Sequence, residues 1–266
     1  MLSVNFLSCP FNLGSPNKLT ALGCLQLSRF FKSINCEAIY HWIIKSYSAF
    51  FSQMAGILAF EKFFLPCLTP ASNQRNIFIN GDHFSTFFCF LKMQALVANL
   101  KIVWFDSHPD LNTPKTTPSG NLHGMTLSAL LGRQNRQLTR LVQHPLRFED
   151  IILVSPFDID PGEEVAIKKH NIMVLSLEKF STLKLNCPVY VSFDFDSIKF
   201  EDFPAVNTVS KSKNSLSQVE TALISFIRSN DVVAIDFNEF DPGKDPNLDC
   251  FKTAISLIQR LSFEGL

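Results

Sequence analysis

The sequence predicts one α/β domain over residues 1–266, a three-layer αβα sandwich with a mostly parallel sheet of about eight strands. Short apolar runs rich in β-branched residues alternate with longer helical patterns, which indicates repeated strand–helix units. These runs lack polar alternation, as is typical of strands buried on both faces of a parallel sheet. At 266 residues and 46% hydrophobic composition, the chain can bury one large core.

The expected elements follow from these runs. Strands are predicted at 4–9, 77–80, 102–105, 151–155, 172–175, 189–193 and 232–235, with a weaker eighth at 38–40. Helices are predicted at 18–32, 42–64, 84–100, 125–132, 163–170, 215–228 and 248–261. The loop 112–120 is long and rich in Thr, Pro and Ser, and long loops after strands often carry binding residues.

Charge, cysteine content and apolar runs exclude several classes of protein. The 24 Lys and Arg balance the 24 Asp and Glu, so neither nucleic acid nor an anionic membrane is an expected partner. The seven cysteines include no C-x-x-C pair, which indicates free thiols in a reducing cytoplasm. Pro10 ends the apolar N-terminal run and charged residues interrupt 50–65, so neither a signal peptide nor a membrane span is predicted.

Acids and histidines follow three of the predicted strands. Parallel sheets bind ligands at the carboxyl ends of their strands, so the fold can bring these side chains together. Three of them, Asp106, His108 and Asp110, alternate in the sequence after the predicted strand 102–105. An extended segment would therefore point their side chains the same way. A single acid at a strand end is commonly a cap or turn residue, a reading that remains open for Asp82. The remaining candidates are His83, Asp106, His108, Asp110, Asp194 and Asp196.

Six ligand-type side chains exceed the four positions of a tetrahedral zinc ion. Their bias towards carboxylates favours manganese over zinc. The sequence therefore predicts a pair of divalent ions, each with oxygen-rich coordination.

Segments along almost the whole chain resemble motifs of arginases and other ureohydrolases, and they occur in family order. The most specific segment, 106–124, closely resembles the arginase signature. The others are 81–83 (G-D-H), 158–163 (D-x-D-P-G-E), 192–196 (S-F-D-x-D), 234–242 (similar to D-x-x-E-x-N-P) and, more weakly, 9–14. The resemblance implies hydrolysis of L-arginine to L-ornithine and urea by a metal-bridging hydroxide, and assembly into trimers or hexamers.

The resemblance also implies two Mn²⁺ ions per chain with shared ligands. One ion would be held by His83, Asp106, Asp110 and Asp194, and the other by Asp106, His108, Asp194 and Asp196. Asp106 and Asp194 would bridge the two ions.

A guanidinium substrate requires further groups. Glu239 is expected to position the cation, Asp110 to pass a proton to the leaving amine, and His123 to shuttle protons because its ordinary pKa lies near neutrality. The candidates for the far end of an amino-acid substrate are Asn112, Thr117 and Ser119 for the carboxylate, Asp160 with Glu163 for the ammonium, and Thr208. Each is alternatively an ordinary turn residue.

Two other functions remain open. Another ureohydrolase would act on agmatine, a guanidino acid or formimidoylglutamate, but the polar loop 112–119 favours a substrate that carries a carboxylate. A non-catalytic, metal-binding homologue is favoured only by departures from the family pattern, chiefly Phe84 in place of Ser and Lys199 in place of Asp. Asn80 in place of Gly and Phe157 in place of Arg are further departures.

Overall fold

The computed structural model describes residues 3–16, 19–31 and 53–265. In these residues, seven strands form one sheet in the order β1-β2-β7-β6-β3-β4-β5. Every neighbouring pair is parallel, which confirms the predicted parallel sheet. The weaker strand candidate at 38–40 lies outside the described residues. The strands are β1 (Ser3–Cys9), β2 (Gln74–Asn80), β3 (Lys101–Phe105), β4 (Ile151–Val154), β5 (Met173–Leu175), β6 (Val189–Asp194) and β7 (Val232–Asn238).

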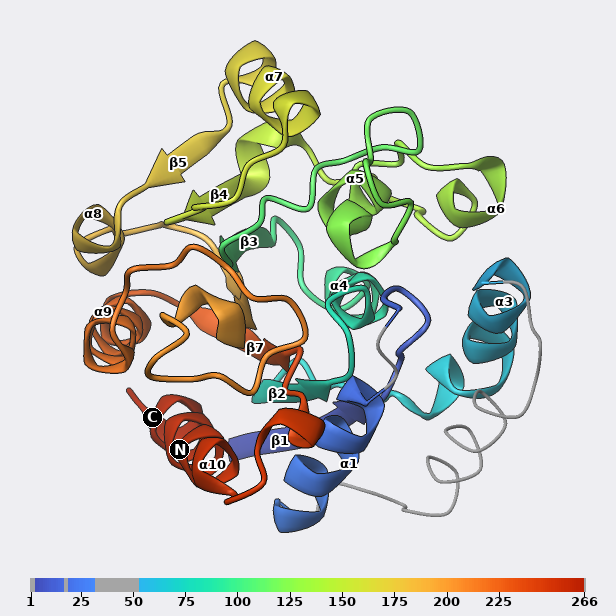
Figure 1. The fold of residues 1–266 in the computed structure, drawn as a ribbon. Coiled ribbons are helices and arrows are strands. Elements are labelled where there is room, and N and C mark those ends of the chain that lie inside the picture. The colour runs from blue at the N-terminus through green and yellow to red at the C-terminus, as the bar shows by residue number, and fades with distance from the viewer. Residues whose placement is uncertain (1–2, 17–18, 32–52, 266) are drawn as a thin grey trace.

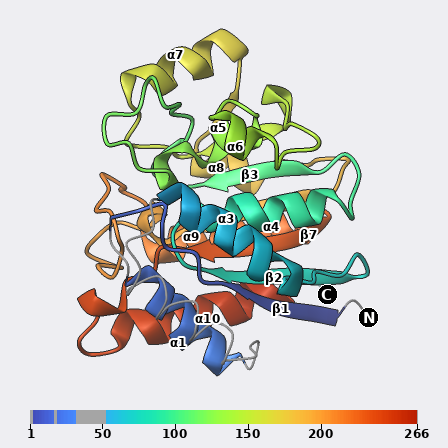
Figure 2. The same ribbon diagram turned by 90° about the vertical axis from the view of Figure 1, so that its right-hand side faces the viewer.

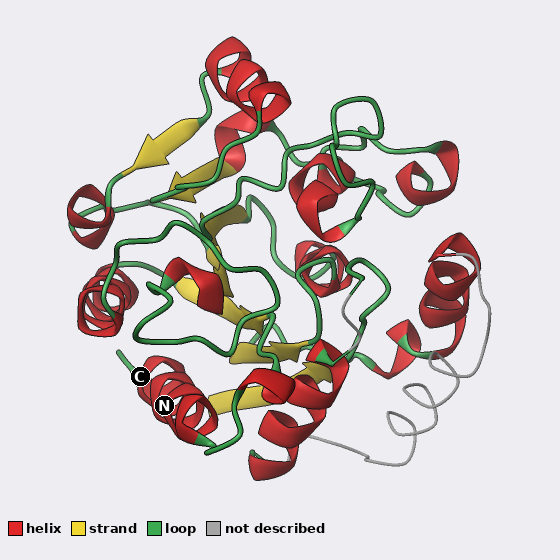
Figure 3. Ribbon diagram, in the orientation of Figure 1, coloured by secondary structure: helices red, strands yellow, loops and turns green. Residues whose placement is uncertain are grey.

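Helices cover both faces of this sheet. Figure 1 shows α4 and α5 on one side and α8, α9 and α10 on the other, and Figure 2 shows α3 and α4 in front of the strands. The strands form the middle layer, drawn as yellow arrows in Figure 3. The helices are α1 (Thr20–Phe30), α3 (Gln53–Phe63), α4 (Ser85–Gln94), α5 (Thr126–Leu130), α6 (Arg136–Thr139), α7 (Pro161–His170), α8 (Leu177–Ser181), α9 (Leu216–Ser229) and α10 (Asp249–Phe263). Short 3₁₀ helices span Leu65–Cys67, His123–Met125, Phe148–Asp150, Phe195–Ser197 and Pro242–Lys244.

Two short helices were not predicted. With four and five residues, α6 and α8 carry too little periodicity to be read from apolar spacing. Their N-caps are nevertheless visible in the sequence, because the side chains of Asn135 and Ser176 accept backbone N–H groups of the first turn. The helix predicted at 84–100 ends earlier, at Gln94, and Asn99 beyond it has a left-handed φ of 55°.

Two hydrophobic cores lie on opposite faces of the sheet. In β2, Phe78 packs in the core that contains Phe87 of α4, whereas Ile77 and Ile79 pack in the core that contains Leu223 of α9. Successive strand residues point to opposite faces, so both faces of β2 must be apolar to be buried. The two cores confirm the predicted three-layer arrangement.

Two expectations about the whole chain concern cysteines and membranes. The cysteines that the structure describes are free thiols at positions 9, 24, 67, 89, 187 and 250. Over the described ranges, no helix combines the length and apolar character needed to cross a membrane.

The turn after β2 depends on a glycine. The Gly81 N–H donates to the carbonyl of Cys9 at 2.9 Å, and the Asp82 N–H donates to the carbonyl of Phe11 at 2.8 Å. A Cβ atom on Gly81 would lie 2.0 Å from the Phe11 carbonyl oxygen. Only glycine therefore permits the segment after β1 to lie against this turn, which leads directly into His83.

Replacing this glycine should destabilise the fold. We expect Gly81→Ala to lower the free energy of unfolding by about 1–3 kcal/mol, the usual cost of overpacking a close contact. Gly124→Ala is the matched control, because no heavy atom lies within 4 Å of its built Cβ. Denaturant unfolding followed by circular dichroism measures both variants. Equal stability of the two would contradict the steric argument.

Candidate active site

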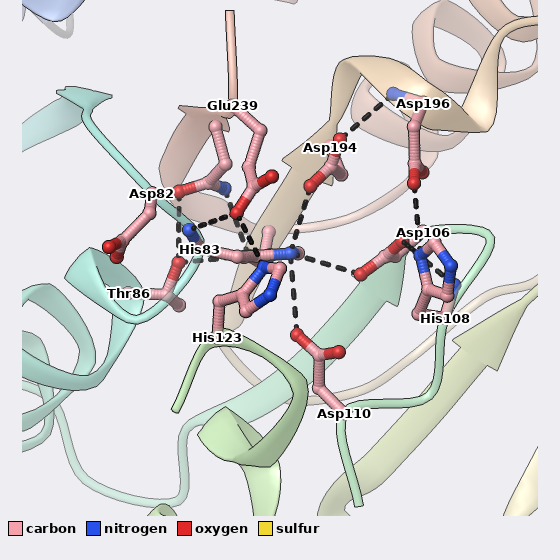
Figure 4. Close-up of polar contacts among 12 residues, drawn as sticks. Asp82, His83, Thr86, Asp106, His108, Asp110, His123, Asp194, Asp196 and Glu239 are labelled. Carbon is pink, nitrogen blue, oxygen red and sulfur yellow. Dashed lines mark hydrogen bonds and ion pairs between the residues drawn. The ribbon is translucent and has the colours of Figure 1, made fainter. Parts of the chain in front are cut away.

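The predicted ligand residues come together over four neighbouring strands. His83 follows β2, Asp106 follows β3, Asp194 ends β6 and Glu239 follows β7. These strands are contiguous in the sheet, in the order β2-β7-β6-β3, although they are not consecutive in the chain. Parallel pairing places their carboxyl ends at one edge, and Figure 4 shows the side chains converging there.

The His83 ring faces three carboxylates. Its Nδ1 lies 3.0 Å from Oδ2 of Asp106, 3.2 Å from Oδ2 of Asp194 and 3.5 Å from Oδ2 of Asp110. The Nδ1 atom and Oδ2 of Asp110 are both buried without a hydrogen-bond partner. The other ring nitrogen, Nε2, lies 2.9 Å from Oγ of Ser192. Buried ligand atoms that face one another without hydrogen bonds fit a cation between them.

A second group of ligand atoms lies beside the first. Nδ1 of His108 is 3.0 Å from Oδ2 of Asp196 and 3.5 Å from Oδ1 of Asp106. Two sets of side chains have ligand atoms within 4.8 Å of one another, namely His83 with Asp106 and Asp194, and Asp106 with His108 and Asp196. Asp106 belongs to both sets. This donor set of carboxylates and imidazoles fits two divalent ions.

The raised pKa values of three carboxyl groups in the cluster also fit bound cations. Burial, reinforced by the charge of Asp106, raises the pKa of Asp110 well above its ordinary value. Burial, with Asp196 and Asp106 nearby, does the same to the pKa of Asp194, and burial raises the pKa of Asp196 to about 7. These directions mark an excess of buried negative charge, which divalent cations offset.

Glu239 is held beside this cluster by three neighbours. Its Oε1 accepts the backbone N–H of His83 at 3.0 Å and lies 3.0 Å from Nδ1 of His123, and its Oε2 accepts from Nδ2 of Asn207 at 2.7 Å. Burial alone would raise the pKa of Glu239, but His123 and the His83 N–H lower it. Burial alone would lower the pKa of His123, but the neighbouring Glu239 carboxylate raises it above its ordinary value. Glu239 is therefore an anion fixed in place.

Two of the predicted acids have left-handed backbone conformations. Asp110 has a φ of 50° and Glu239 a φ of 68°. Residues with a side chain adopt this region at an energetic cost, and such strain concentrates at functional sites.

The ligand side chains form the floor of a cavity of about 810 Å³. All the substrate candidates from the sequence line it, namely Asn112, Thr117, Ser119, Asp160, Glu163, Thr208 and Glu239. Asn112 Nδ2 donates to Oδ2 of Asp160 at 2.7 Å, so these two side chains are joined at the wall. The Ser119 hydroxyl accepts the backbone N–H of Asn121 at 3.2 Å, and Thr117 Oγ1 accepts that of Gly120 at 3.0 Å.

Asp160 and Glu163 also have a structural role. Together they form the capping box at the start of α7. Both carboxylate oxygens of Glu163 accept backbone N–H groups, from Leu111 at 2.9 Å and from Asp160 at 3.0 Å. Burial raises the pKa of Glu163 to about 7.

The sequence did not reveal two residues of the cavity wall. Asn207 supports Glu239 from a segment without a motif, although it directly precedes the candidate Thr208. Lys211 forms an ion pair with Asp158, and its backbone N–H donates to the same carboxylate at 2.7 Å. The contacts of Asn207 with Glu239 and of Lys211 with Asp158 join segments about thirty and about fifty positions apart in the chain. Only proximity in the fold could therefore identify them.

Three uncertain positions have clear structural roles. Both oxygens of Asp82 accept backbone N–H groups, from Gly14 at 2.6 Å and from Phe84 at 3.1 Å, and the side chain lies away from the cluster in Figure 4. Phe84 is fully buried in a hydrophobic core. Lys199 forms an ion pair with Asp202 at 3.2 Å and does not line the cavity. Neither departure from the family pattern intrudes on the ligand cluster.

The parallel sheet, with its cluster of carboxylates and histidines at the strand ends, defines an α/β protein with a candidate metal site. The model of the Arginase family matches residues 44–263. This chain therefore belongs to the arginase family.

Individual relatives agree with this assignment. The chain is 28% identical over 207 residues to the arginase of Plasmodium falciparum, a match that covers 70% of this chain and 50% of that protein. It is 28% identical to an arginase of Staphylococcus aureus, over 70% of this chain and 67% of the relative. The chain thus spans half the length of the Plasmodium falciparum relative. The crystal structure of Bacillus subtilis arginase has the same fold, with a TM-score of 0.77 at 22% identity over 99% of each chain.

Because Asp106 belongs to both ligand sets and His108 to one, the two variants should keep different amounts of metal. We expect manganese loading to give about two ions per chain in the wild type, as in paired-ion hydrolases. Asp106→Ala should lose most of this metal, because its carboxylate belongs to both ligand sets, whereas His108→Ala should keep about one ion. Elemental analysis after dialysis measures the stoichiometry. One ion or none in the wild type would refute the dinuclear assignment.

Proposed function

We propose that the chain is a manganese-dependent arginase, which hydrolyses L-arginine to L-ornithine and urea. Two ligand sets that share Asp106 lie in the same cavity as a buried anion, Glu239. This combination is the observation that carries the proposal. The relatives named arginases support the choice of substrate.

The proposed ligands are those predicted from the sequence: His83, Asp106, His108, Asp110, Asp194 and Asp196. When bound, a pair of divalent ions supplies a nucleophile near neutral pH by lowering the pKa of water. The protein's own task is to hold a guanidinium in front of these ligands. Glu239 is suited to it, because its carboxylate is an anion that neighbouring groups keep in one orientation.

Protons must also move from the attacking water to the leaving amine. Asp110 has two carboxylate oxygens, of which Oδ2 faces the other ligand atoms. The second oxygen, Oδ1, would accept a proton from the attacking water and return it to the leaving amine. His123 connects this region with the solvent, since its side chain is 18% exposed and lies 3.0 Å from Glu239. It is therefore the candidate proton shuttle.

The second candidate is another ureohydrolase. A formimidoylglutamase from Bacillus subtilis has a similar fold, with a TM-score of 0.67 at 12% identity. A urea-release assay with L-arginine, agmatine and guanidino acids, together with a formamide-release assay on formimidoylglutamate, tests both candidates in the presence of Mn²⁺. L-arginine should be the best substrate, and a clear preference for any of the others would replace the proposal.

The cavity wall predicts discrimination against agmatine, which lacks the α-carboxylate. Each wall group left unpaired costs about 1–3 kcal/mol, so kcat/KM for L-arginine should exceed that for agmatine about a hundredfold or more. The Asn112→Ala, Ser119→Ala double variant should reduce this ratio. Lys115→Ala is the control, because Lys115 is exposed in the same loop and does not line the cavity. An unchanged ratio in the double variant would show that other residues carry the specificity.

The Glu239 carboxylate should matter through its charge. We expect Glu239→Gln to lower kcat/KM for L-arginine about a hundredfold or more, since a neutral amide no longer pairs with the guanidinium. Asn207→Ala should have a smaller effect in the same direction, because it removes one hydrogen bond to Glu239 and leaves the charge. Steady-state kinetics at saturating Mn²⁺, with metal content measured in parallel, checks both. Activity of Glu239→Gln equal to the wild type would exclude this role.

A further inference from the structure

A buried polar network lies directly behind the metal-facing histidine. It joins β2, β6 and β7 through the side chains of Asn80, Ser192, Asp236 and Asn238, none of which is more than 2% exposed. Ser192 pairs with Asp236, and Asp194 with Asn238, in the ladder of β6 and β7. Buried side-chain polar groups in this number require a reason, because each costs free energy to remove from water.

The carboxylate of Asp236 accepts four hydrogen bonds. The donors are Tyr190 Oη at 2.7 Å, Ser192 Oγ at 2.8 Å, Asn238 Nδ2 at 2.7 Å and the Phe193 N–H at 3.3 Å. The Ser192 hydroxyl donates to Asp236, so its oxygen can accept the hydrogen on Nε2 of His83, 2.9 Å away. The same oxygen lies 3.2 Å from Oγ1 of Thr86 and 3.4 Å from Nδ2 of Asn238.

This order of donors fixes the orientation of the imidazole. With the hydrogen on Nε2 directed to Ser192, the Nδ1 atom faces the carboxylate cluster, where a bound cation would take its lone pair. A metal ligand needs that lone pair, and its partner on the other ring nitrogen sets the tautomer and the ring orientation.

The orientation of the Asn238 amide depends in turn on Asn80. Nδ2 of Asn238 donates to Asp236 and, at 3.1 Å, to the carbonyl of Phe193. Its Oδ1 accepts from Nδ2 of Asn80 at 2.9 Å and from Oγ1 of Thr86 at 3.2 Å. A flipped amide would place Oδ1 against two acceptors, and it would place Nδ2 against the amide donor of Asn80. The Asn80 partner therefore holds the Asn238 donor towards Asp236.

We propose that Asn238, oriented by Asn80, is a positioning residue for the metal centre: through Asp236 and Ser192 it holds the His83 ring with Nδ1 turned towards the carboxylates. The inference rests on the proposed function only in treating the carboxylate cluster as the metal centre.

Manganese affinity, measured by titration calorimetry, tests the inference without an activity assay. Asn238→Ala should weaken Mn²⁺ binding about 10- to 100-fold, the usual effect of losing a partner behind a ligand. Asn80→Ala should weaken it about 10-fold, because Thr86 still contacts the Asn238 oxygen.

Asn76→Ala is the matched control. Asn76 is also fully buried in β2 and hydrogen-bonded, but its partners are the N–H and C=O of Ala71, at 2.9 and 2.8 Å, the Asn5 amide and the Gln74 carbonyl, rather than the network behind His83. This variant should lose stability without losing Mn²⁺ affinity. An equal loss of affinity in Asn76→Ala and Asn80→Ala would overturn the inference, since general destabilisation would then explain both.

The remaining outcomes separate this inference from the proposed function. Wild-type Mn²⁺ affinity in Asn238→Ala overturns it, and if that variant does not fold, wild-type affinity in Asn80→Ala does so. A wild-type protein that binds Mn²⁺ and hydrolyses no guanidino compound refutes the proposed function. In that case a loss of affinity in Asn80→Ala, absent from Asn76→Ala, still supports the inference.

Discussion

Mutual repulsion among buried carboxylates is the constraint on which this structure depends. Asp106, Asp110 and Asp194 all have an oxygen within 3.5 Å of a single histidine nitrogen, and each is nearly inaccessible to solvent. Burying such charges costs several kcal/mol per ion after relaxation, and protein hydrogen bonds offset only part of it. A site of this kind is stable when it holds cations, and a rigid frame must keep the ligands together in their absence.

The parallel sheet supplies that frame. The four site-bearing strands lie side by side, and both faces of the sheet are covered by helices and hydrophobic cores. Ligands at the ends of buried strands can therefore shift little. The connections between strands are free to differ, and they form the cavity wall through Asn112, Asp160 and Asn207. This division separates the candidate metal ligands, which follow the strands, from the candidate substrate contacts, which lie in the loops.

The sequence predicted the features that depend on local pattern. Strand positions followed from apolar runs. The candidate ligand residues, which the fold brings together, followed from acids and histidines at strand ends, helped by the resemblance to arginases. Asn207 and the pairing of Asn80 with Asn238 could not be predicted, because each contact joins segments far apart in the chain. The helices α6 and α8 were too short to have a clear period. What escaped prediction therefore arises from tertiary contact rather than from local preference.

Strand β7 shows how one segment serves both parts of the site. Regular alternation points Asp236 and Asn238 to the same face, into the network behind His83. Continued alternation would turn Glu239 to the opposite face, away from that network. Instead, its φ of 68° ends the strand, and its N–H donates to the carbonyl of Gly81 at 2.9 Å. The strained conformation is what brings the Glu239 carboxylate beside His83 and His123. Backbone strain at one residue thus joins the proposed support of a metal ligand to the proposed binding of a cationic substrate.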